Sequence, residues 1–84
     1  MYLHATGAVT DVEKLAPHRE EETRVLAELQ AEGVVRNVFR VNARQVYMIL
    51  EADDVKDARR QVGRLPFVSN GLLAFEFEPV EKLI

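Results

Sequence analysis

The sequence predicts an α+β domain whose segments follow the order β-α-β-β-α-β. Two stretches place apolar residues at helical spacing, and four others are rich in β-branched and aromatic residues. The two middle strands are joined only by Asn42-Ala43-Arg44, a connection so short that it permits only an antiparallel hairpin. This order predicts a four-stranded antiparallel sheet with both helices on one face, which is the ferredoxin-like arrangement.

The first half of the chain is expected to form one strand and one helix. Residues 2–10 read as the strand and residues 11–16 as a connection. Pro17 suits the first helical position, where its missing N–H has no cost, and the Glu20–Glu22 run complements the positive end of the helix dipole. Gly33 is expected at the C′ position that follows the helix.

The second half is expected to contain three strands and the second helix. Asp53 or Asp54 can cap this helix, and its apolar residues recur at helical spacing. Pro66 is expected to end it near Leu65, because the residue before a proline is disfavoured in the helical region. The strands are expected at residues 34–41, 45–52 and 71–80.

Composition narrows the class of protein. The 84 residues, of which 48% are hydrophobic, suit one globular domain over residues 1–84. A net charge of -3 argues against a nucleic-acid partner, and no apolar run approaches the length of a membrane span, about 20 residues. No cysteine is present, and the N-terminus does not resemble a signal peptide. We therefore expect a cytoplasmic protein without a membrane or nucleic-acid partner.

The sheet face opposite the helices is expected to be apolar. In the third strand Val46, Met48 and Leu50 point one way, whereas Tyr47 and Ile49 point the other. An exposed apolar patch of this kind usually marks an interface. We therefore expect a homodimer or a higher homo-oligomer, in which a second copy stacks its sheet on this face with two-fold symmetry.

Two long stretches resemble a known family. The segment from Glu20 through RVLAELQAEGVVRNVFRV, and the later LPFVSNGLLAFEFEPV, resemble muconolactone delta-isomerase and its relatives. They are also similar to the YCII-related proteins, which belong to the same dimeric α+β barrel superfamily. The resemblance covers about residues 2–80. It implies an enzyme without cofactor or metal that moves a proton within an unsaturated lactone, in a pocket between the sheet and the first helix.

Glu22 and His18 are the candidate catalytic residues. Glu22 matches an acidic position of the isomerases and continues the apolar stripe of Val25 and Leu29. Apolar neighbours would raise its pKa by desolvation and make it a plausible base near neutral pH. His18 lies four residues earlier, a spacing that allows a hydrogen bond between the two. The alternative is that both side chains are exposed to solvent at the start of the helix and have no catalytic role.

The candidate substrate-binding residues are polar side chains of the second and third strands. Arg36 and Arg40 are four positions apart and are therefore expected on one face, where they could bind a substrate carboxylate or form salt bridges at a subunit contact. Asn37 stands where the isomerases have a histidine. Tyr47 can donate a hydrogen bond to a substrate oxygen or pack locally. The two histidines lack metal-ligand spacing, so no metal site is expected.

Two functions from different classes fit these residues. The first is a cofactor-free isomerase of catabolism that acts on a small unsaturated lactone or organic acid, with Glu22 as base and His18 assisting. The second is a non-catalytic domain of the same fold that binds a small ligand or holds subunits together. The apolar third strand favours the second. Fold cannot decide between an enzyme and a binding domain, because this fold hosts unrelated functions.

Overall fold

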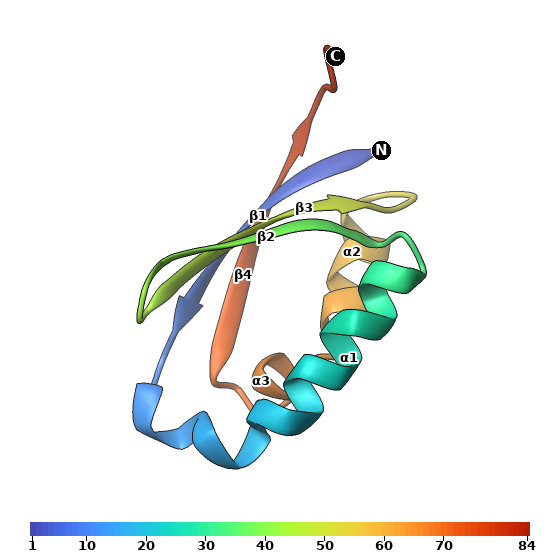
Figure 1. Ribbon diagram of the computed structural model, residues 1–84. Coiled ribbons are helices and arrows are strands. Elements are labelled where there is room, and N and C mark those ends of the chain that lie inside the picture. Colours follow the sequence, from blue (N-terminus) through green and yellow to red (C-terminus); the bar gives the residue numbers. More distant parts are fainter.

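The computed structural model describes all 84 residues and contains one sheet with helices packed on one of its faces (Figure 1). The strands are β1 (Tyr2–Val9), β2 (Val35–Asn42), β3 (Gln45–Glu51) and β4 (Leu73–Val80), in the spatial order β2-β3-β1-β4. The helices are α1 (Arg19–Ala31), α2 (Val55–Val62) and α3 (Pro66–Ser69). All strand pairs are antiparallel, so the predicted ferredoxin-like α+β fold is confirmed. None of the helices is both long enough and apolar enough to cross a lipid bilayer.

Helix α1 begins later than predicted and ends where predicted. Pro17 lies in a 3₁₀ turn, Ala16–His18, and the α-helix starts only at Arg19. The acidic first turn remains, since Glu22 and its two predecessors lie within it. Gly33 follows the helix with φ of 81°, a left-handed conformation that glycine adopts without steric cost.

The segment between α2 and β4 differs from the prediction. Asp54 caps α2 as expected, because its side chain accepts the N–H of Asp57 at 2.7 Å. The helix then ends at Val62, three residues before the predicted end. Pro66 does not end α2 but starts α3, where its fixed φ suits the first helical position. This short helix, which the sequence did not predict, packs against α1.

The hydrophobic core fills the space between the helices and one face of the sheet. Leu3, Leu29 and Leu50, from β1, α1 and β3, are fully buried there. Gly7 of β1 allows this packing, since a Cβ at its position would lie 2.7 Å from a ring carbon of Phe75. The strand can therefore approach its neighbours' side chains only with glycine at this point.

An irregularity in β2 decides which of its side chains face the helices. Val35 and Asn37 pair with consecutive residues of β3, so Arg36 is an extra residue that forms a β-bulge. Because of this extra residue, the side chains from Asn37 to Arg40 lie on the faces opposite to those that simple alternation from Val35 would predict. Arg40 pairs with Val46 on the helix side, whereas Arg36 lies on the opposite, outer face. The expectation that the two arginines share one face is therefore wrong.

The outer face of the sheet carries a row of aromatic rings. Phe39 stacks on Tyr47 with ring centroids 4.9 Å apart, and His4 follows at 5.3 Å from Tyr47. The row crosses β2, β3 and β1, and Phe39 is 46% exposed. This is the surface on which the sequence predicts that a second copy packs, and that assembly stays a prediction.

Candidate active site

Glu22 is the one buried charged residue, and it connects two helices. Its side chain projects from the first turn of α1, and the residue is only 9% exposed. Carboxylate atom Oε1 accepts the backbone N–H of Phe67 at 2.9 Å. The first N–H groups of a helix have no partner within it, so Glu22 supplies an acceptor that α3 lacks.

The environment of Glu22 suits proton transfer. Burial raises the pKa of its carboxyl above the ordinary value, because the charged form loses hydration. The N–H of Phe67 acts in the opposite direction but with the smaller effect. No fully buried side-chain oxygen lacks a hydrogen-bond partner, and Oε2 makes no hydrogen bond. Oε2 is therefore not completely buried, and no other group of the chain occupies it.

A cavity of about 430 Å³ opens beside Glu22, between α1 and the sheet. Its volume lies within the range of small-molecule sites, roughly 300–1,000 Å³. Glu22 and Arg40 are its two charged residues, and its walls are apolar: Leu26, Val38, Val46, Met48, Phe67 and Leu73. It occupies the place where the family resemblance implies a substrate pocket.

A second cavity of about 170 Å³ adjoins the first and brings in another cation. The two share Arg40 and three apolar residues, and the smaller one adds Arg19. Neither arginine forms an ion pair within the chain. The two adjoining cavities thus contain two guanidinium groups that form no ion pair and one carboxyl, that of Glu22, and this excess of cations favours an anionic ligand. The sequence analysis missed Arg19, although its i,i+3 spacing from Glu22 places both on one helix face.

His18 does not join this site. It makes no hydrogen bond to Glu22, whose Oε1 is bonded to Phe67 instead, and it lines neither cavity. His18 precedes α1, and its backbone (φ -106°, ψ -1°) departs from helical geometry. The i,i+4 relationship predicted from the sequence therefore does not bring the two side chains together.

The other three candidate substrate-binding residues lie on the outer face. Arg36 contacts Glu51 at 3.1 Å and, with Asn37, lines a separate pocket there. Tyr47 belongs to the aromatic row. The sheet itself separates these side chains from Glu22, so one small molecule cannot contact both sets. Nowhere in the chain do three or more His, Asp or Glu side chains gather as metal ligands would.

Fold and site together define a ferredoxin-like α+β domain with a carboxyl and a guanidinium in a cavity on the helix side of the sheet. Among solved structures, the chain is similar to muconolactone isomerase, with a TM-score of 0.76 and 19% identity over 98% of this chain and 90% of that one. It is also similar to 5-chloro-2-hydroxyhydroquinone dehydrochlorinase from Burkholderia phenoliruptrix in complex with 2,5-dihydroxybenzoquinone. There the TM-score is 0.76 and the identity 15%, over 96% and 94% of the two chains. No protein-family model and no curated protein matches the sequence. The chain therefore has a muconolactone isomerase-like fold, as the sequence resemblance predicted.

Proposed function

We propose that the protein is a small enzyme, independent of a cofactor, that moves a proton on a small anionic lactone or unsaturated organic acid. The observation that carries this proposal is the position of Glu22. Its carboxyl is buried, has a raised pKa, retains one oxygen without a hydrogen bond and lines a cavity that also contains Arg40. Of the two similar structures, one is named for a lactone and the other for a hydroxyhydroquinone, which supports a small cyclic substrate.

Glu22, Phe67 and Arg40 would have different roles in this reaction. The N–H of Phe67 holds Oε1, which leaves Oε2 to take a proton from the ring carbon that the double bond conjugates with the substrate's carbonyl group. The electron pair of the broken C–H bond moves into an enolate, and the same carboxyl returns the proton to a different carbon. Arg40 binds the substrate's carboxylate, and the apolar walls strengthen this attraction by excluding water.

Deuterium exchange tests the proposal directly. With muconolactone in D₂O, we expect the wild-type protein to catalyse the isomerisation and to place solvent deuterium on the product, measured by proton NMR. Glu22→Gln keeps an oxygen that can accept the Phe67 N–H but cannot take a proton. It should lower the rate by about 10²–10⁴-fold, the usual contribution of a general base.

Glu20→Gln is the matched control, because Glu20 is an exposed carboxylate in the same helical turn. It should leave the rate unchanged. Full activity of Glu22→Gln would contradict the mechanism, and no isomerisation of muconolactone by the wild-type protein would contradict the assignment to this substrate.

One observation favours the competing function, in which the cavity binds a small ligand without catalysis. Six of the eight residues that line the larger cavity are hydrophobic, and Glu22 already has a structural role as the acceptor for α3. In that case the wild-type protein would bind muconolactone without exchanging its protons, and Glu22→Gln would bind it as well. The same NMR samples distinguish the two functions.

A further inference from the structure

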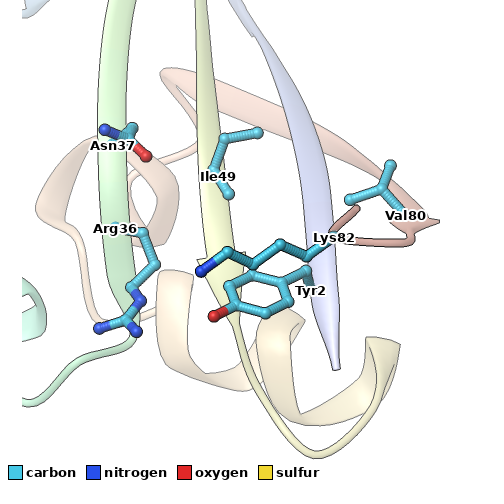
Figure 2. Close-up of a pocket in the computed structure, with 6 residues that line it drawn as sticks. All are labelled: Tyr2, Arg36, Asn37, Ile49, Val80 and Lys82. Carbon is cyan, nitrogen blue, oxygen red and sulfur yellow. The ribbon is translucent and has the colours of Figure 1, made fainter. Parts of the chain in front are cut away.

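A pocket that differs chemically from the two cavities near Glu22 lies on the outer face of the sheet. It is found at the end of the sheet where β1 begins and β4 ends, and its volume is about 280 Å³. Ile49 of the pocket pairs with His4 of the aromatic row, so a second copy packed on that row would border the pocket. It shares no residue with either of the cavities near Glu22. Figure 2 shows the six residues that line it: Tyr2, Arg36, Asn37, Ile49, Val80 and Lys82.

The β-bulge in β2 supplies the first cation of this pocket. Arg36 is the inserted residue, and the bulge directs its side chain to the outer face beside Asn37 (Figure 2). The Tyr2 hydroxyl and the Glu51 carboxylate both lie close enough to raise the pKa of Arg36 above its ordinary value. A guanidinium has five N–H donors, so these two neighbours orient the group and leave donors for a ligand.

Lys82 supplies the second cation, from the segment that follows β4. Its Nζ lies 5.5 Å from the centre of the Tyr2 ring, and no carboxylate pairs with it. In Figure 2 the ammonium group extends past the Tyr2 ring toward the side of the pocket where Arg36 lies. One carboxylate, Glu51, accompanies the two cations, so the pocket has an excess of positive charge.

We propose that this outer pocket is a binding site for a small organic carboxylate with an apolar body. The cations and the Tyr2 hydroxyl would bind the carboxylate, since charge-assisted hydrogen bonds are the strongest available to such a group. Ile49 and Val80 would contact the apolar body. The volume is at the lower end of the range for small-molecule sites, which suits a ligand with a single ring.

Benzoate is a suitable probe, with benzamide as its uncharged counterpart of nearly the same shape. In a titration of the ¹⁵N-labelled protein followed by NMR, benzoate should shift the backbone amides of the lining residues. Benzamide should bind about tenfold more weakly or worse, as expected when a charged hydrogen bond is lost. Lys82→Met keeps the length of the side chain and should raise the Kd of benzoate by about tenfold.

Lys56→Met is the matched control, because Lys56 is an exposed lysine of α2 without an ion pair. It should leave the Kd unchanged. Three results would overturn the proposal: equal binding of benzamide, an unchanged Kd in Lys82→Met, or shifts confined to residues around Glu22. Because the pockets share no residue, the result does not depend on whether Glu22 is catalytic.

Discussion

Glu22 of α1 and Phe67 of α3 are joined by a 2.9 Å hydrogen bond between residues that are 45 positions apart in the sequence. The bond attaches the short helix α3 to the first turn of α1. It also occupies one carboxylate oxygen and leaves the other without a hydrogen bond, in a side chain that lines the cavity. The same contact therefore contributes to the fold and orients the proposed base, and suitable substitutions separate the two roles.

Substitutions of Glu22 that keep or remove an acceptor should differ in stability. Glu22→Ala leaves the N–H of Phe67 without its partner and should lower the free energy of unfolding by about 1–3 kcal/mol. Glu22→Gln keeps an acceptor oxygen and, at about pH 4, should be close to the wild-type protein. Urea denaturation of the three proteins at that pH measures the difference, and equal stabilities for Ala and Gln would contradict the role of the bond.

The raised pKa of Glu22 predicts how stability changes with pH. Burial raises the pKa above 4.5, so the folded protein holds this proton more tightly than the unfolded chain. The stabilisation that comes from the protonated Glu22 carboxyl is fully present below pH 4.5 and is lost as the pH rises through the pKa of Glu22 in the folded state. Glu22→Gln cannot ionise, so its Tm relative to wild type should rise between about pH 4 and about pH 8. A difference in Tm that stays constant with pH would show that Glu22 titrates normally.

Arg40 and Arg19 should determine the affinity for anionic ligands of the two adjoining cavities. Arg40→Gln removes the cation that lies in both cavities and should weaken muconolactone binding by about 10–100-fold, the usual loss for a charged hydrogen bond. Arg19→Gln should have a smaller effect, because Arg19 lines only the smaller cavity. Calorimetry measures both. Arg44→Gln, in the exposed β2–β3 turn, is the control, and an equal loss there would show that only net charge matters.

Gly7 should tolerate no side chain. A Cβ at this position would lie 2.7 Å from Phe75 and 2.9 Å from Val46, so Gly7→Ala should cost about 1–3 kcal/mol of stability through overpacking. Val46 and Leu73 also line the cavity, so their displacement should reduce ligand binding as well. Urea denaturation gives the first effect and calorimetry the second. Thr6→Ala, at the neighbouring exposed position, should be nearly neutral in both.

The aromatic row on the outer face should hold two copies of the chain together. Phe39→Glu places a charge in the row and should convert a dimer into a monomer, measured by light scattering after size-exclusion chromatography. Ala27→Glu, on the exposed surface of α1, adds the same charge elsewhere and should not change the mass. A wild-type protein that is monomeric at every concentration would contradict the predicted assembly.

Local sequence patterns were sufficient to predict the topology of the fold and the position of Glu22 on the buried face of α1, because both depend on the periodicity of apolar residues. The helical stripe that ends at Leu29 places Glu22 on the buried face of α1, and the structure shows it there. The partner of Glu22 could not be predicted in this way, since Phe67 is distant in sequence. Pro66 was ambiguous for a local reason: proline is found both after the end of a helix and at the start of one.

Local patterns could not predict that Arg36 and Arg40 lie on opposite faces of the sheet. Alternation along a strand predicts the face of a side chain only where the strand pairs regularly with its neighbour. The bulge at Arg36 arises from the pairing of β2 with β3, which no pattern within β2 encodes. Arg19 was missed for a different reason. Its value comes from the cavity that the folded chain forms beside it, not from its sequence neighbours.

The bulge also has an evolutionary consequence. Because Val35 and Asn37 pair with adjacent residues of β3, a deletion of residue 36 would make the pairing regular from Val35 to Arg40 and leave these later side chains on their present faces. A single-codon deletion or insertion can therefore remove or create the outer cation while Arg40 stays in place. Homologues that differ by one residue at this point would share the inner cavity but not the outer pocket. If such a homologue were aligned with this chain without a gap at the bulge, the alignment would match residues from opposite faces of the sheet.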